Sequence, residues 1–216
     1  MAIKAIIFDL DGTLVDSIYD IGTAVNGALN FFNLPPSPLE SYSEMVGDGL
    51  LTVVKKAAPS SASADLIQEI LKKTFEFYEH CYDKQTKIYP SIDQLLNSLT
   101  EKQIKLAILS NKQDYFTKKI TESVLGKWKF QPVLGSKENI PRKPDPYTLN
   151  QIISDFNIDK NNCLFVGDSG SDIKTAISAE VTPIGVSWGY RPVSDLVQNG
   201  ATKIIDHPMD LLYYLS

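Results

Sequence analysis

Two acidic side chains follow an apolar stretch near the start of the chain. The segment AIIF ends at Phe8, Asp9 and Asp11 come next, and Gly12 and Thr13 follow them. Residues two apart in a strand share a face, so both carboxylates can project toward one point. Paired carboxylates can supply a nucleophile, a general acid–base or ligands for a hard cation.

A plain structural explanation covers part of this pattern. An Asp-Gly pair between two apolar runs is a hairpin-turn signal, and it accounts for Asp11, Gly12 and Thr13 without any function. It does not account for Asp9, an acid placed directly after an apolar run. A calcium-binding loop is disfavoured, because the glycine comes too early and the later acidic ligands are missing.

Polar residues also follow other apolar runs. Ser110-Asn111 directly follow KLAIL, and Asp168 directly follows CLFVG, with Asp172 four residues after Asp168. Lys143 lies in PRKPDP, between these two segments in the sequence. Each has a structural explanation when taken alone: a helix cap, a turn acid, a first-turn charge or a solvated lysine. Ligands of parallel sheets bind beyond the carboxyl ends of the strands. Taken together, these residues therefore predict one site at that edge.

The elements that must position these residues alternate between strand and helix from about residue 88 onward. Asp145 is expected to cap one of the helices, with Pro146 at its first position. Strands separated by helices of this length imply parallel crossovers and an α/β, doubly wound parallel sheet. The expected strands are 105–111, 130–136, 162–169, 182–187 and 202–206, and the expected helices are 91–101, 113–125, 145–158, 171–180, 192–199 and 208–215.

Residues 16–87 break this alternation. They are predicted to be almost entirely helical, over 17–33, 41–57 and 64–83, with a proline-rich turn at 34–38. The domain organisation predicted is a core made of residues 1–15 and 88–216, with a helical domain of residues 16–87 inserted after the first strand. Hinges are expected near Val15-Asp16 and Gln85–Lys87.

Composition narrows the classes of function. The chain has 216 residues, 43% of them hydrophobic, and a net charge of −5, which suits a globular core and argues against a nucleic-acid partner. No apolar run approaches the length of about 18 residues that a membrane helix needs. Two lone cysteines, Cys81 and Cys163, fit buried thiols in a reducing compartment. We expect a cytoplasmic protein that is a monomer or homodimer and does not bind membranes.

Four segments together resemble a known family. DLDGTLVDS, LSN, KPDP and GDSGSD, in this order and at roughly this spacing, resemble the four motifs of the haloacid-dehalogenase-like superfamily over the whole chain. The helical insertion is similar to the family's helical cap domain. VGDGLLTVV in the cap and GVSWGYR after the fourth motif resemble the phosphoglycolate-phosphatase-like branch. The resemblance implies a Rossmann-like core with a cap over the site.

Metal and acid–base roles can be assigned from the residue types and the resemblance. Asp9 and Asp168 are the natural side-chain ligands of Mg²⁺, which prefers oxygen. By resemblance, Asp9 is also the nucleophile, and Asp11 gives the metal its backbone carbonyl and keeps its carboxyl free as general acid and base. Asp172 is expected to hold a metal-bound water or to orient Asp168.

The remaining candidates contact the phosphoryl group or close the site. Lys143 is expected to supply positive charge against the nucleophile and the transferring group. The turn Gly47-Asp48-Gly49 is a candidate for a cap loop that reaches the substrate, although it also fits a simple helix–helix turn. The expected phosphate- or substrate-binding residues are Ser110, Asn111, Gly12, Thr13, Gly47 and Gly49.

The function expected is a Mg²⁺-dependent phosphomonoesterase that acts on a small phosphorylated metabolite through an aspartyl-phosphate, with phosphoglycolate as the first guess. The acid at position 11 favours phosphoryl transfer, because dehalogenases of the superfamily lack it. A pyrophosphatase, a nucleotidase and a sugar-phosphate phosphatase or phosphomutase stay open. So does a different class, a non-catalytic phospho-switch or phosphate-binding module, which turnover would distinguish.

Overall fold

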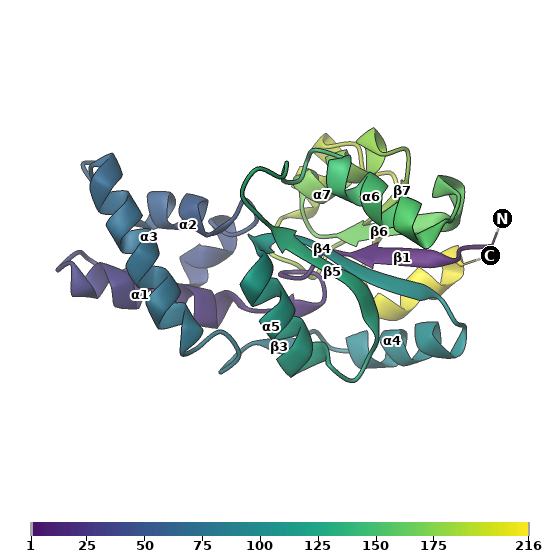
Figure 1. The fold of residues 1–216 in the computed structure, drawn as a ribbon, viewed down its shortest axis with the longest axis horizontal. Coiled ribbons are helices and arrows are strands. Elements are labelled where there is room, and N and C mark those ends of the chain that lie inside the picture. Colours follow the sequence, from purple (N-terminus) through teal and green to yellow (C-terminus); the bar gives the residue numbers. More distant parts are fainter. Residues whose placement is uncertain (1, 216) are drawn as a thin grey trace.

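The computed structural model describes residues 2–215, and a six-stranded sheet forms the centre of the molecule (Figure 1). Every pair of neighbouring strands in this sheet is parallel, which confirms the predicted α/β fold. The strand order is β5-β4-β1-β6-β7-β8. The strands are β1 (Ala5–Phe8), β4 (Lys105–Gln113), β5 (Phe130–Ser136), β6 (Cys163–Gly167), β7 (Thr182–Val186) and β8 (Ile204–Ile205).

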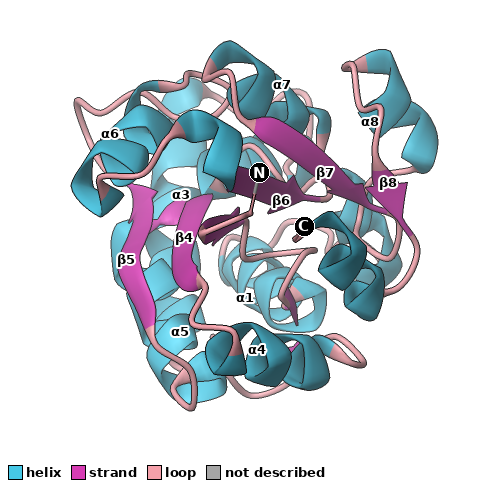
Figure 2. Ribbon diagram, turned by 90° about the vertical axis from the view of Figure 1, so that its right-hand side faces the viewer, coloured by secondary structure: helices cyan, strands magenta, loops and turns pink. Residues whose placement is uncertain are grey.

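Helices cover both faces of the sheet (Figure 2). Ala5 and Ile7 of β1 face a cluster that includes Leu149 and Ala176, whereas Ile6 and Phe8 face the larger cluster on the other side. Because both faces are buried, β1 is apolar throughout, as parallel strands usually are. The helices between and after the strands of the sheet are α4 (Ile92–Glu101), α5 (Asp114–Leu125), α6 (Tyr147–Phe156), α7 (Gly170–Ser178), α8 (Val193–Gln198), and the 3₁₀ helices η2 (Lys160–Asn162) and η3 (Pro208–Tyr214).

The strand order places a switch point at β1. The chain passes from β1 to β4 and β5 on one side, then returns to β6, β7 and β8 on the other side. Ligands of doubly wound sheets bind where the order reverses, beyond the carboxyl ends of the strands. Asp9 follows β1 directly, so the topology places it at this point.

The segment between β1 and α4 folds into helices that lie together at one end of the molecule (Figure 1). They are α1 (Ile18–Phe31), η1 (Leu39–Glu44), α2 (Leu50–Ala57) and α3 (Ala64–Glu79). Two short strands, β2 (Val15–Asp16) and β3 (Lys87–Ile88), pair antiparallel where this segment begins and ends. We call residues 16–87 the cap.

Several predicted elements differ from the structure. The predicted helix 41–57 is divided into η1 and α2, because Gly47 and Gly49 have φ of +130° and +86°, backbone conformations that end a helix. Helix α3 ends at Glu79 rather than at residue 83. The buried carboxylate of Asp20 accepts hydrogen bonds from Gln85 N, Thr86 N and Thr86 Oγ1 and thereby holds the chain that returns to β3.

Other differences lie in the core. Helix α6 begins at Tyr147, so Pro146 precedes it, and the Asp145 carboxylate accepts from Tyr147 N at 2.9 Å. The last predicted helix is the 3₁₀ helix η3. Strands β2 and β3 have two residues each, too short for any apolar periodicity to reveal. Within residues 2–215, none of the helices combines the length and the apolar character that a membrane crossing requires.

Candidate active site

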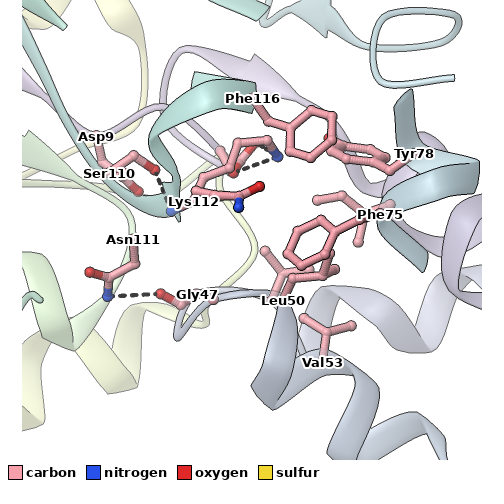
Figure 3. Close-up of a pocket in the computed structure, with 15 residues that line it drawn as sticks. Asp9, Gly47, Leu50, Val53, Phe75, Tyr78, Ser110, Asn111, Lys112 and Phe116 are labelled. Atoms are coloured by element: carbon pink, nitrogen blue, oxygen red, sulfur yellow. Dashed lines mark hydrogen bonds and ion pairs between the residues drawn. The ribbon is translucent and has the colours of Figure 1, made fainter. Parts of the chain in front are cut away.

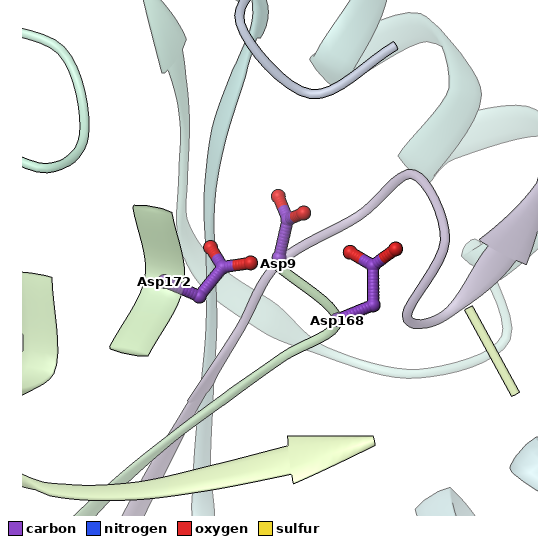
Figure 4. Close-up of side chains that lie close together, drawn as sticks. All are labelled: Asp9, Asp168 and Asp172. Atoms are coloured by element: carbon purple, nitrogen blue, oxygen red, sulfur yellow. The ribbon is translucent and has the colours of Figure 1, made fainter. Parts of the chain in front are cut away.

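Three buried carboxylates meet at the carboxyl end of the central strands (Figure 4). Asp9, Asp168 and Asp172 each present an oxygen within 4.8 Å of the other two. Asp9 leaves β1 with its N–H bonded to the Val166 carbonyl of β6 at 2.9 Å. The ends of β1 and β6 and the first turn of α7 thus bring together three of the acids that the sequence singles out, at the edge that the parallel topology predicts.

Asp168 is fixed by close backbone approach. Its Oδ2 accepts from Tyr190 N at 2.8 Å. A Cβ on Gly12 would lie 2.3 Å from that oxygen, and a Cβ on Gly189 would lie 2.2 Å from the Asp168 Cβ. Gly12 also has a φ of +82°, which favours glycine. The structure therefore explains Gly12 by space and conformation, whereas its predicted contact with phosphate stays a prediction.

Lys143 joins two of the acids. Its Nζ lies 2.6 Å from Asp172 Oδ1 and 2.8 Å from Asp9 Oδ1. The other Asp172 oxygen accepts from Ser169 N at 3.0 Å and from Ser169 Oγ at 2.6 Å, in a capping box at the start of α7. Both Asp172 oxygens are thus engaged, which fits a positioning role better than direct contact with a metal.

The electrostatics of this cluster are unbalanced. Burial, outweighing the attraction of Lys143, raises the pKa of Asp9 to about 7. Burial, together with the charges of Asp172 and Asp9, raises the pKa of Asp168 well above its ordinary value. Burial alone would lower the pKa of Lys143, but the charges of Asp172 and Asp9 raise it. Additional positive charge would therefore stabilise the ionised forms of Asp9 and Asp168.

The residues fit a divalent cation. Carboxylates that hold a metal must be ionised. In that state the three carboxylates and the one ammonium would leave two negative charges buried together. Asp9 Oδ1 contacts Lys143 as an ion pair, yet it receives no well-directed hydrogen bond from any described residue. Carboxylate oxygens are the ligands that hard divalent cations prefer. A charge of +2 held by Asp9 and Asp168 would balance the cluster.

The Asp11 side chain has partners of its own. Its oxygens lie 3.1 and 3.0 Å from Lys112 Nζ, and Oδ1 also accepts from Ser17 Oγ at 2.5 Å. Asp11 lines the same cavity as Asp9. Ser17, at the start of the cap, and Lys112 of β4 therefore position the Asp11 carboxyl. Neither belongs to the Asp9–Asp168–Asp172 cluster.

Strand β4 is irregular where it reaches the site. Its pairing with β5 shifts register between Leu109 and Gln113, so Ser110, Asn111 and Lys112 lie within the irregular part rather than after the strand. Bulges of this kind re-aim side chains next to active sites. Ser110 Oγ accepts from Lys112 N at 3.2 Å.

Asn111 connects three segments. Its Oδ1 accepts from Lys143 N at 3.0 Å, and its Nδ2 donates to the Lys143 carbonyl at 3.1 Å. The same Nδ2 donates to the Gly47 carbonyl at 3.2 Å (Figure 3). One amide thus holds the Lys143 loop and the cap loop. Its predicted contact with a phosphoryl group stays a prediction.

The cap loop Gly47-Asp48-Gly49 lies against the core. Arg191 of the core donates from Nη1 to the Glu44 carbonyl at 2.9 Å and from Nη2 to the Val46 carbonyl at 2.8 Å. Both Gly47 and Gly49 line the cavity that contains Asp9. The structure thus brings this predicted loop to the site.

A small cavity lies between the cap and the core (Figure 3). Its volume is about 40 Å³, room for only a few water-sized groups of roughly 10–15 Å³ each. Thr13 does not line it: its hydroxyl is buried without a described hydrogen-bond partner, and its carbonyl accepts from Trp188 Nε1 at 3.1 Å. The lining residues are Asp9, Asp11, Ile21, Val46, Gly47, Gly49, Leu50, Val53, Phe75, Tyr78, Ser110, Asn111, Lys112, Gln113 and Phe116.

Sequence reasoning missed several residues of the site. Lys112 directly follows the predicted pair Ser110-Asn111, so its position was itself a usable signal. Tyr190 and Arg191 belong to GVSWGYR, a segment noted only for its resemblance. Ser17 closes DLDGTLVDS, where it is likewise noted only for the resemblance. Tyr78 carries no signal in the sequence, because its proximity to Lys112 depends on how the cap folds back.

This chain is similar to known proteins in sequence and in fold. Residues 6–186 match the family described as Haloacid dehalogenase-like hydrolase. Phosphoglycolate phosphatase 1 of Pseudomonas aeruginosa is 30% identical over 97% of this chain and 78% of its own length. Phosphoglycolate phosphatase of Psychrobacter arcticus is 31% identical over 98% of this chain and 95% of its own. A crystal structure of a predicted phosphoglycolate phosphatase from Haemophilus somnus is 27% identical, with a TM-score of 0.90 over 99% of this chain and 98% of that one.

Proposed function

This chain belongs to the haloacid dehalogenase-like hydrolase family, and on that basis we propose that it hydrolyses phosphoglycolate with Asp9 as nucleophile. The observation that carries this proposal is the arrangement of Asp9. Its carboxylate lies at the switch point of the sheet, against Lys143 and Asp168, and lines a cavity beneath the cap.

In the first step, Asp9 forms a bond to phosphorus while the ester bond breaks. The leaving alkoxide takes a proton from Asp11, which lines the same cavity and whose carboxyl is held by Ser17 and Lys112. Lys143 stabilises negative charge at Asp9 and at the transferring group from a preorganised position. The products of this step are the alcohol and an aspartyl-phosphate at Asp9.

In the second step, water attacks the phosphorus of the aspartyl-phosphate and the bond to Asp9 breaks. Asp11, now ionised, accepts the proton of that water, so one residue serves as acid and then as base. Ser110 and the backbone near Asn111 are proposed to donate hydrogen bonds to the phosphoryl oxygens. Inorganic phosphate leaves, and Asp9 and Asp11 return to their starting states.

Magnesium is the proposed cofactor, held by Asp9, Asp168 and the Asp11 carbonyl. It would offset the repulsion between the phosphate ester and an ionised nucleophile. Asp172 keeps Lys143 and the start of α7 in place beside these ligands. The raised pKa values of Asp9 and Asp168 support this assignment, because they mean that the ionised carboxylates lack sufficient positive charge nearby.

Phosphoglycolate is proposed on two grounds. Two relatives of about 30% identity are named phosphoglycolate phosphatase. In addition, the cavity of about 40 Å³ suits a short leaving group. We place residues 16–87 as a cap that closes over the substrate and excludes water. A cytoplasmic location is proposed as well, which the free thiols of Cys81 and Cys163 support. A monomer or homodimer is the proposed oligomeric state.

A substrate panel with Mg²⁺ tests the proposed function. We expect phosphate release over many turnovers, with a higher kcat/KM for phosphoglycolate than for nucleoside monophosphates, hexose phosphates or pyrophosphate. A higher kcat/KM for any of these others would contradict the proposed substrate. Binding of phosphate without turnover of any ester would contradict an enzyme and favour a phosphate-binding module.

A further inference from the structure

The cavity beneath the cap is mostly apolar, and this limits the leaving group. Away from Asp9 and Asp11 its wall includes Leu50, Val53 and Phe75. A sugar or nucleoside in this space would leave hydroxyl groups without partners, which costs free energy for each buried group. The wall therefore selects a leaving group whose polar atoms lie close to the scissile bond.

Among the described residues that line this cavity, Lys112 carries the one cationic side chain. Its Nζ lies 3.0 Å from an Asp11 oxygen and 4.9 Å from the centre of the Tyr78 ring. Its side chain is 7% exposed. The ammonium is thus held between a carboxylate and an aromatic face, in contact with the proposed general acid.

Lys112 has bonding capacity that the protein leaves unused. An ammonium has three donors, and the hydrogen bonds of Lys112 Nζ in the described chain go to the two Asp11 oxygens alone. The Tyr78 ring can attract a cation but does not replace a third acceptor. A donor therefore remains for an anion entering the cavity.

We propose that Lys112 determines specificity by binding a second oxyanion on the leaving group, a carboxylate or a phosphate attached close to the scissile oxygen. Asp11 contacts both the leaving oxygen in the proposed mechanism and Lys112 in the structure. An oxyanion one or two bonds from the leaving oxygen comes within reach of Lys112. The positive charge of Lys112 screens that oxyanion from the Asp11 carboxyl. This inference rests on the proposed function and deepens it.

The test compares phosphoglycolate and pyrophosphate with phosphoglycolamide, the neutral analogue of phosphoglycolate. In Lys112→Gln, a hydrogen-bond donor to Asp11 remains but the charge is lost. We expect kcat/KM for the oxyanion substrate that wild type prefers to fall about tenfold or more relative to phosphoglycolamide, mainly through KM, as loss of a charged hydrogen bond predicts. Lys112→Arg should restore most of the preference.

Lys55→Met is the matched control, because it removes the same charge from an exposed position of α2. It should leave the ratio between the two classes of substrate unchanged. If Lys112→Gln lowers activity on all substrates equally, Lys112 only positions Asp11 and the proposal is wrong. If Lys112→Gln does not fold, loss of the preference in folded Lys112→Met supports the proposal, and its retention overturns it.

The two levels of inference fail differently. If wild type prefers oxyanion leaving groups but Lys112→Gln keeps that preference, only the role of Lys112 is wrong. If wild type hydrolyses p-nitrophenyl phosphate yet does not prefer an oxyanion leaving group, the proposed substrate is wrong and the role of Lys112 falls with it. A wild-type preference for pyrophosphate over phosphoglycolate would identify the bound oxyanion as a phosphate.

Discussion

At the scale of single residues, the site depends on one ammonium among three carboxylates. Lys143→Ala would leave Asp9, Asp168 and Asp172 without their buried counter-charge. We expect kcat to fall roughly 10²–10³-fold, the usual loss when one preorganised electrostatic group is removed. Steady-state kinetics with saturating Mg²⁺ measure this. Near-wild-type turnover would show that Lys143 has no part in the reaction.

The raised pKa of Asp9 makes a prediction about pH. The folded, metal-free protein keeps Asp9 protonated up to about pH 7, whereas the unfolded chain ionises it near its ordinary value of about 3.9. Between these values the folded state binds more protons, so stability falls as the pH rises from about 4 to 7. Urea unfolding in a chelator should show this fall, and Mg²⁺ should stabilise the protein more at pH 8 than at pH 5.

Asp9→Asn is the matched control for that titration, since an amide does not ionise. The difference in unfolding free energy between wild type and this variant should shrink or change sign as the pH rises. A difference that is constant from pH 4 to 8 in the absence of metal would contradict the raised pKa of Asp9.

At the scale of elements, the cap loop is held to the core by few hydrogen bonds. Arg191→Met would remove the two bonds to the Glu44 and Val46 carbonyls. We expect kcat/KM to fall roughly 10-fold, because each bond to a charged donor contributes about 1.5–3 kcal/mol and part of it is replaced by water. Arg142→Met is the control, because exposed Arg142 lies beside Gly49 without a described hydrogen bond to the cap. Equal losses of kcat/KM in both variants would contradict the role of Arg191 in holding the cap loop to the core.

The parallel sheet was predictable because strand patterns alternate with helical patterns from about residue 88 onward. The site was predictable because polar residues follow the apolar runs of β1, β4 and β6, and parallel topology brings such ends together. The route of the cap was not. The turn at residues 80–86 depends on the buried Asp20 carboxylate, 65 positions before Gln85 in the sequence. Likewise, the Asn111 amide bonds both Lys143 and Gly47. Contacts between distant segments leave no local periodicity to detect.

At the scale of the whole molecule, cap and core share one apolar cluster. Phe116 of α5 lies with its ring centre 4.7 Å from that of Tyr78, 6.0 Å from Phe75 and 6.1 Å from Tyr82, all residues of the cap. Phe116→Ala should destabilise the protein by about 3–5 kcal/mol. Denaturant unfolding followed by far-UV circular dichroism and by tryptophan fluorescence measures the loss, and a change below about 1 kcal/mol would contradict this packing.

The most direct test of the central claim is to identify the phosphorylated residue during turnover. p-Nitrophenyl phosphate has a leaving group that departs without a proton donor, so Asp11→Asn should still be phosphorylated but should hydrolyse its aspartyl-phosphate slowly. After acid quenching, mass spectrometry of this variant should find one phosphoryl group on the peptide that contains Asp9. A phosphoryl group on another residue, or turnover with no phosphorylated enzyme at any time, would contradict the account.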